Sequence, residues 1–198
     1  MHLDLYDKTI DKQINKLKEV ILNNKNIVFI LKKLQEYNLD NYYLGAGCIS
    51  QTIFNYYHGY DLENNINDYD IVYFDNDLTY EKEDKIIKEI KELCCDIKVN
   101  LDIKNQARVH LWSLKSLGRQ INQIYYLEEA IRGWGTTVTC IGVRLKDNYL
   151  EIFAPYGLND LFGLKVIPIK ENIPKEVYIK KTIKWKEKWP LLDIYDWK

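Results

Sequence analysis

The stretch Asp68-Tyr69-Asp70-Ile71-Val72-Tyr73-Phe74 decides the fold, because it joins two carboxylates to a run of strand-forming residues. Aromatic and β-branched side chains favour extended backbone, so a strand is predicted over residues 69–74. Side chains two residues apart point to the same face of a strand, which places Asp68 beside Asp70. Neighbouring anions repel unless a cation neutralises them, and magnesium takes oxygen ligands of this kind. A turn that ends in aspartates would give the same string, so both interpretations stay open.

A second acidic strand follows at residues 97–104, where apolar and polar residues alternate. Asp102 lies in the middle of it, in a position that disfavours an acidic residue. If this strand pairs with residues 69–74, the carboxylates of Asp68, Asp70 and Asp102 converge. Such a trio can hold two magnesium ions, one to activate an acceptor hydroxyl and one to clamp a triphosphate. The alternative is an Asp102 side chain that simply faces solvent.

A glycine turn precedes both acidic strands. A short apolar piece at residues 42–44 runs into Gly45-Ala46-Gly47, and residues 50–57 are predicted to form the helix that follows. Glycine lets the backbone approach a phosphate closely, and the helix N-terminus and the Ser50 hydroxyl can donate hydrogen bonds to it. Gly47 and Ser50 are therefore candidate nucleotide-binding residues, although an ordinary turn explains one Gly-x-Gly equally well.

The other elements are predicted from hydrophobic periodicity and turn residues. We expect two helices within residues 7–39 with a break at Asn23-Asn24-Lys25-Asn26, then a loop over 58–68 and a helix that is capped by Thr79 and ends near residue 93. A loop is expected after residue 112, followed by a helix over 126–132. Strands over 136–145 and 149–153, joined by a hairpin at Lys146-Asp147-Asn148, and a helix over 175–189 complete the prediction.

With 198 residues, 46% of them hydrophobic, the chain is long enough for one core and too short for two full domains. We expect one domain (residues 1–198), made of N-terminal helices (1–39), a core (40–165) and a C-terminal segment (166–198). The 28 basic and 29 acidic residues give a formal charge of -1, which provides no global field to attract nucleic acid or an anionic membrane.

The cysteines and the N-terminus indicate the compartment. The spacing of Cys48, Cys94, Cys95 and Cys140 does not match a zinc site, and we expect buried thiols. The N-terminal residues lack an apolar signal region, and no apolar run reaches the length of a membrane span. We therefore expect a cytoplasmic protein with no membrane partner.

The order of glycine turn, helix, Asp-x-Asp strand and acidic strand resembles the DNA polymerase β-like nucleotidyltransferase superfamily. The superfamily motif is a hydrophobic residue, Gly, then Gly or Ser, followed by Asp-hydrophobic-Asp/Glu and a later strand carboxylate. Ala46-Gly47-Cys48, Asp68-Tyr69-Asp70 and Asp102 occupy those places. Cys48 stands where the motif has Gly or Ser, and the gap from the glycine to the aspartates is longer than usual. Both departures affect the expected positioning of the triphosphate more than the expected metal binding.

Residues 44–197 are similar to an uncharacterised bacterial family described as nucleotidyltransferase-like. The matching strings are Ala46-Gly47-Cys48 with Gln51-Thr52, residues 68–75, residues 105–112, residues 154–162, and Lys184-Trp185 with Trp189-Pro190. The resemblance implies an α/β (α+β) fold, a mixed β-sheet flanked by helices with helical N-terminal and C-terminal segments. It implies this fold and a metal triad more firmly than any substrate.

The resulting hypothesis is an enzyme that uses magnesium to move a nucleoside monophosphate from an NTP such as ATP to a hydroxyl acceptor on a small molecule, an RNA or a protein. Asp68, Asp70 and Asp102 are the candidate catalytic and metal-binding residues. Arg108, which closely follows the Asp102 strand, can bind a phosphate through its forked donors, or form a salt bridge instead.

Two other functions fit the sequence. The same fold can serve as an inactive module that binds a nucleotide or a protein. The lysines and tryptophans of the last predicted helix can bind nucleic acid through phosphate contacts and stacking, although such lysines usually form a solvated face.

Overall fold

The computed structural model of the chain describes residues 3–118, 120–147 and 149–198. The helices are α1 (Ile10–Asn23), α2 (Lys25–Tyr37), α3 (Gly47–His58), α4 (Tyr80–Leu93), the 3-10 helix η1 (Gln106–Arg108), α5 (Val109–Leu117), α6 (Leu127–Arg132), α7 (Asn159–Phe162) and α8 (Lys175–Lys188). The strands are β1 (Tyr42–Gly45), β2 (Asp68–Tyr73), β3 (Asn100–Asn105), β4 (Gly142–Lys146), β5 (Tyr149–Phe153), β6 (Lys165–Val166) and β7 (Asp193–Ile194).

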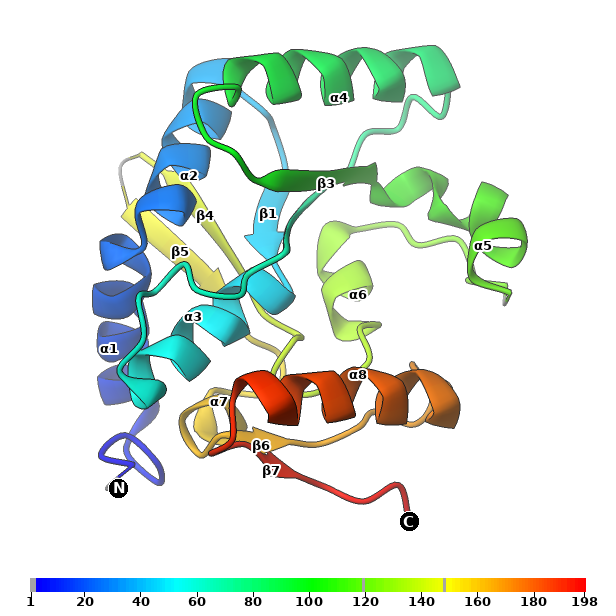
Figure 1. Cartoon of the computed structure of the whole chain (residues 1–198). Coiled ribbons are helices and arrows are strands. Elements are labelled where there is room, and N and C mark those ends of the chain that lie inside the picture. The colour runs from blue at the N-terminus through cyan, green and yellow to red at the C-terminus, as the bar shows by residue number, and fades with distance from the viewer. Residues whose placement is uncertain (1–2, 119, 148) are drawn as a thin grey trace.

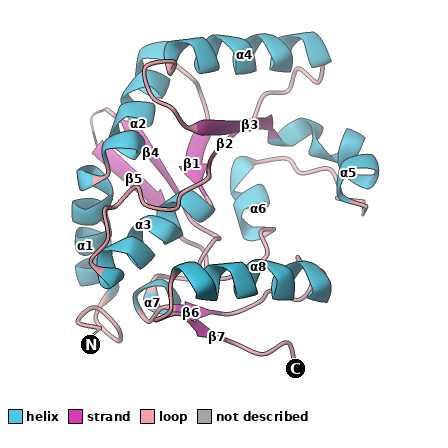
Figure 2. Cartoon of the chain, viewed as in Figure 1, coloured by secondary structure: helices cyan, strands magenta, loops and turns pink. Residues whose placement is uncertain are grey.

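Five strands form a mixed sheet in the order β3-β2-β1-β4-β5, and β6 pairs with β7 apart from it (Figure 2). β1 runs antiparallel to β2 and β4, β4 runs antiparallel to β5, and β2 and β3 are parallel. This confirms the predicted fold class, a mixed sheet flanked by helices. The parallel pair matters for the site, because it sets the two acidic strands next to each other.

One face of the sheet forms the main core. Alternate residues of β2 and β3 point into it, among them Tyr69, Ile71 and Ile103, and the helices α1, α2 and α3 cover it (Figure 1). The apolar stripes that predicted α1 and α2 lie in this core; Leu17 and Ile21 have no exposed surface. Most of the hydrophobic burial of the chain is therefore on the side away from Asp70 and Asp102.

The other face of the sheet is covered by much less of the chain. Tyr43 and Val72 pack there against Leu127 and Ile131 of the short helix α6. Figure 1 shows α6 between β3 above it and α8 below it. Because α6 is only one and a half turns long, the sheet beside it keeps an uncovered polar surface.

The predicted break between the first two helices is confirmed at Asn24. Its backbone leaves the helical region, and its side-chain oxygen accepts a hydrogen bond from the backbone N–H of Ile27 (3.0 Å). Its amide also donates to the Thr52 hydroxyl (2.9 Å) on α3. Asn24 therefore caps α2 and fixes α2 against α3, which is why a polar residue is buried there.

Three expectations from the sequence are wrong. The loop expected after residue 112 is instead part of α5, which continues to Leu117. The first part of the strand expected over 136–145, residues 136–141, is a turn in which the Thr136 and Thr139 hydroxyls bond to each other (2.8 Å), and β4 begins at Gly142. Cys95 is exposed, although the other cysteines are buried. The hairpin after β4 is as predicted up to Asp147, and Asn148 lies outside the described residues. Across the described chain, no helix combines the length and apolar character needed to cross a membrane.

α8 starts after Pro174 and is anchored by tryptophans. Trp185 and Trp189 are buried, and each meets Phe54 of α3 edge to face. The Trp189 indole N–H donates to the Asn55 side-chain oxygen (2.7 Å). The tryptophans thus pack α8 onto α3 and are not available for stacking on nucleic acid.

We predict that Trp189→Phe lowers the free energy of unfolding by about 2–4 kcal/mol, because it leaves a small cavity and an unpaired Asn55 carbonyl. Urea denaturation measures the change, with Trp197→Phe as the control for a half-buried indole. An unchanged midpoint for Trp189→Phe would show that α8 is held by other contacts.

Candidate functional site

Asp70 and Asp102 are in-register neighbours on the parallel strands β2 and β3. Neighbouring strands lie about 4.8 Å apart, so the two carboxylates share one patch of the open sheet face. Asp68 lies two residues before Asp70 on the same face, opposite Asn100 of β3. The predicted pairing of the two acidic strands is therefore present.

The three carboxylates have different surroundings. Asp102 forms an ion pair with Lys104, two residues further along β3. Asp68 is exposed and accepts a hydrogen bond from the Asn100 amide (2.6 Å). Asp70 is half-buried, and burial, together with the charge of Asp102, raises its pKa from 3.8 to about 6. The charge of Asp70 is thus the least compensated of the three.

A cavity of about 910 Å³ opens over this patch of the sheet. Its wall includes Asp68, Asp70 and Gly47; Asp102 does not line it, but its ion-pair partner Lys104 does. The rest of the wall comes from α5, from α6 and the turns on either side of it, and from α8. The cavity therefore joins the acidic strands to parts of the chain that lie far apart in sequence.

The glycine turn places the start of α3 at this cavity. Ala46 has a positive φ (φ 57°, ψ −130°), which is strained for a residue with a side chain, and its N–H donates to the Ile141 carbonyl (3.0 Å). Gly45 has no room for a side chain, because a Cβ atom would lie 2.5 Å from the Ile141 oxygen. The sharp turn presents Gly47, the first residue of α3, to the cavity.

Ser50 has a different place from the one expected. It is fully buried, and its hydroxyl donates to the carbonyls of Ala46 and Gly47 within the first turn of α3. It does not line the cavity. The helix therefore turns this hydroxyl inward, and the structure brings Gly47, but not Ser50, to the carboxylates.

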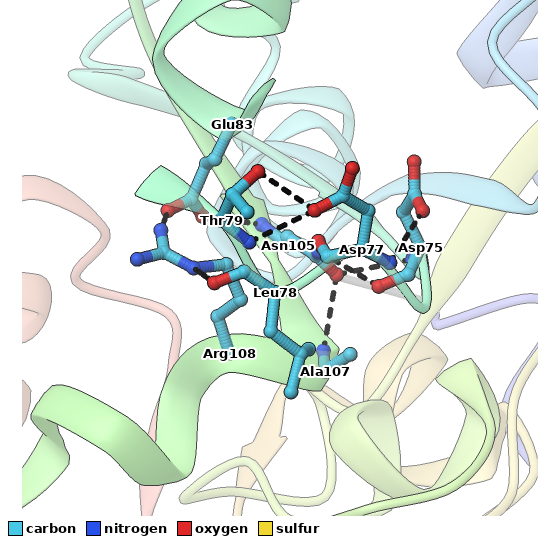
Figure 3. Close-up of polar contacts among 8 residues, drawn as sticks. All are labelled: Asp75, Asp77, Leu78, Thr79, Glu83, Asn105, Ala107 and Arg108. Carbon is cyan, nitrogen blue, oxygen red and sulfur yellow. Dashed lines mark hydrogen bonds and ion pairs between the residues drawn. The ribbon is translucent and has the colours of Figure 1, made fainter. Parts of the chain in front are cut away.

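Arg108 also lies apart from the carboxylates. The 3-10 helix η1 turns it away from the cavity, and its guanidinium forms a buried ion pair with Glu83 of α4 and donates to the Leu78 carbonyl (2.9 Å) (Figure 3). Glu83 also accepts a hydrogen bond from the Asn105 N–H (2.8 Å). The salt bridge that the sequence left open as the alternative is present, and it joins the end of β3 to α4.

The structure adds one residue to the site that the sequence placed only among the lysines of the last helix. Lys181 of α8 lines the cavity, with its ammonium group 4.8 Å from the centre of the Trp185 ring. Solvent reaches Lys181 through the cavity, but the surrounding protein lowers its pKa, an effect that the negative charge of Asp70 opposes. The sequence could have indicated this position of Lys181, because it lies one helical turn before Trp185, and Trp185 fixes which side of α8 faces inward.

The donor set fits a divalent cation through two carboxylates. Within the described residues, no three His, Cys, Asp or Glu side chains are grouped closely enough to hold a metal ion. Asp70 and Asp102 nevertheless lie side by side, and burial, together with the charge of Asp102, raises the pKa of Asp70, so a cation beside this pair would be favoured. Magnesium is commonly held by one or two carboxylates together with substrate phosphates. The arrangement of two ions on three carboxylates stays a prediction.

A mixed sheet with a glycine turn before paired aspartates defines a nucleotidyltransferase-like fold. The chain belongs to a nucleotidyltransferase family, because a family model of that description matches residues 32–194. A solved structure described as an NMR structure that reveals a CCA-adding enzyme head domain matches with a TM-score of 0.74 and 22% identity, over 98% of this chain and 100% of that one. At this identity the likeness shows the fold. No match was found among curated proteins.

We predict that Glu83→Gln and Arg108→Met each lower the free energy of unfolding by about 3–5 kcal/mol, because each leaves a buried charge uncompensated. The double variant should recover part of this loss, which chemical denaturation of all four proteins measures as a coupling energy. If Arg108→Met kept full stability and lost affinity for nucleotides, Arg108 would be a phosphate ligand after all.

We predict that Asp70→Asn stabilises the metal-free protein at pH 7.5, by about 1–3 kcal/mol. Because folding raises the pKa of the Asp70 carboxyl, its ionisation destabilises the folded state. This destabilisation begins as the pH rises past the ordinary pKa of 3.8 and is complete above about pH 6. The gain should therefore fall towards zero at pH 4. Denaturation in a chelator at both pH values, with exposed Asp40→Asn as the control, tests this; an equal gain at both values would rule out the charge as its cause.

Proposed function

We propose that this protein is an active nucleotidyltransferase that moves a nucleoside monophosphate from an NTP to a hydroxyl acceptor. The observation that carries the proposal is the in-register pair Asp70 and Asp102, of which Asp70 lines a cavity that is also lined by Gly47 at the start of α3 and by two lysines. Family membership supports nucleotidyl transfer in general. The carboxylates, the helix N-terminus and the cations are the groups that such a reaction needs.

The cations and the helix N-terminus bind the triphosphate in this proposal. The first backbone N–H groups of a helix carry partial positive charge, and Gly47, the first residue of α3, lines the cavity. Lys104 and Lys181 reach the same cavity from β3 and from α8. Because these groups come from three separate elements, they can hold the phosphates in line with an acceptor.

Asp70 and Asp102, with Asp68 beside them, would hold magnesium, which when bound neutralises phosphate charge and favours ionisation of the acceptor hydroxyl. In the transfer step the acceptor oxygen forms a bond to the α-phosphorus, and the bond from the α-phosphorus to the bridging oxygen breaks. Pyrophosphate leaves with that electron pair. The Asp102 carboxylate takes the proton of the acceptor hydroxyl, once its ion pair with Lys104 opens towards the phosphates.

The ion pair of Asp102 with Lys104 also favours a second candidate function, an inactive nucleotide-binding module. A lysine that permanently neutralises Asp102 would occupy the position of a cation and remove the base. Such a module would keep its affinity for nucleotides when Asp102 is replaced by Asn. The two candidates therefore differ in turnover and in whether Asp102→Asn weakens the binding of a magnesium nucleotide.

We predict that titration calorimetry with ATP, GTP, CTP and UTP detects magnesium-dependent binding of at least one nucleotide. Asp70→Asn should weaken it at least about tenfold, because it removes one of two metal ligands, whereas Asp40→Asn should not. Asp102→Asn should also abolish transfer of label from that nucleotide to a cell extract. Label transfer by Asp102→Asn at the wild-type rate would exclude Asp102 as the base, and absence of binding to any nucleotide would contradict the proposed function.

A further inference from the structure

The cavity has two ends of different chemistry. One end carries Asp68, Asp70, Gly47, Lys104 and Lys181. The other end is mainly apolar and aromatic, and it is built by α5, by the segments around α6 and by the start of α8. We call it the apolar end; its large side chains are Trp112, Ile121, Ile124, Ile173 and Val177, and Trp134 lies between the two ends, because its ring touches Gly45, the strand partner of Asp70.

The apolar end carries almost no charge. Among the described residues that line it, Glu129 is the one ionisable side chain, and it already accepts a hydrogen bond from the Tyr125 N–H (2.9 Å). A nucleic-acid strand is bound mainly through lysines and arginines that neutralise its phosphates. The lysines of the cavity, Lys104 and Lys181, lie at the other end, where the triphosphate is proposed to bind. The apolar end therefore lacks the cations that an RNA acceptor requires.

One polar side chain at the cavity is free to bind a ligand. Gln106 is 8% exposed and lines the cavity, and its side-chain amide makes no hydrogen bond within the described chain. The amide is not among the side-chain groups cut off from solvent, so it meets the cavity and can exchange a water molecule for a ligand hydroxyl. Gln106 directly follows β3, the strand that carries Asp102 and Lys104. Its amide is thus a hydrogen-bonding group close to the base that the proposed function assigns.

We propose that the acceptor is a small, uncharged alcohol with an aromatic or apolar body, which binds at the apolar end and forms a hydrogen bond with Gln106. This inference rests on the proposed function. The cavity of about 910 Å³ lies in the range of small-molecule sites and exceeds what a triphosphate alone requires. The indoles of Trp112 and Trp134 offer flat surfaces to an apolar body, and the place of Gln106 after β3 orients the hydroxyl towards Asp102.

Methyl-selective NMR of the full chain tests this proposal, because the methyl groups of Ile121, Ile124 and Ile173 report on the apolar end and those of Val72 report on the carboxylate end. The probes are the four magnesium nucleotides, the alcohols indole-3-ethanol, 2-phenylethanol and cyclohexylmethanol, and a short RNA with a free 3′ hydroxyl. A nucleotide should shift Val72. With that nucleotide present, at least one alcohol should shift the three isoleucines, with a dissociation constant of about 1 mM or tighter.

Gln106→Leu, which keeps the size of the side chain, should raise the dissociation constant of the alcohol about five- to tenfold. It should leave nucleotide affinity within about twofold, and the matched control Gln123→Leu, on an exposed glutamine outside the cavity, should change neither. This difference separates a ligand contact of Gln106 from a general loss of structure.

Three other results of the NMR experiment would overturn the proposed acceptor. Shifts of the three isoleucines caused by the RNA, or by a nucleotide alone, would overturn the proposal in favour of an RNA acceptor or a nucleobase at the apolar end. Nucleotide shifts at Val72 with no effect of any alcohol would overturn the acceptor class and leave the proposed function intact. No nucleotide effect at Val72 would contradict the proposed function itself, and the acceptor class with it.

Discussion

The structure depends on two like charges held side by side. The parallel register of β2 and β3 places Asp70 directly opposite Asp102, and the partial burial of Asp70 weakens the screening of their repulsion by water. Such a pair is unfavourable on its own, so the surroundings supply positive charge from several directions: Lys104 from the same strand, Lys181 from α8, and the N-terminus of α3. The groups that offset the repulsion are those that would bind a polyanionic substrate.

The register of these strands is secured at the end of β3 and not at the carboxylates themselves. The Asn105 N–H and the Arg108 guanidinium both bond to Glu83, and the Asn105 side chain exchanges hydrogen bonds with the backbone of Asp75 just after β2 (Figure 3). Buried ion pairs add little net stability but are specific in geometry, because each donor has few alternatives in a dry environment. This cluster fixes where both acidic strands end, on the side of the sheet away from the cavity.

Sequence patterns predicted those helices and strands that are determined by residues close together in the chain. Alternation gave the acidic strands, and the polar run at Asn24 gave the helix break. The failures have physical reasons: Leu111 and Leu114 of α5 are exposed, so that helix shows no clear apolar stripe, and the Thr136 and Thr139 hydroxyls bond within a turn, which overrides the strand preference of threonine.

The site was predictable only in part for a related reason. The pairing of Asp70 with Asp102 follows from alternation once the strands are adjacent. Arg108, by contrast, is turned away by one short 3-10 helix, and a change of backbone direction over three residues leaves no periodic signal. Lys181 reaches the cavity from a helix that meets the acidic strands only in the folded chain.

The packing of α8 has a consequence for how this protein can vary. Val177, Lys181 and Trp185 follow one another at intervals of four residues along the cavity, and Trp189, one turn later, is fixed by its bond to Asn55 of α3. Each residue of an α-helix turns it by about 100°. A single inserted or deleted residue between Lys181 and Trp189 would therefore carry the ammonium group out of the cavity, whereas substitutions on the outer face would leave it in place. Residues on the outer face of this helix are free to vary, but the length of the helix is fixed by the need to keep Lys181 opposite Asp70.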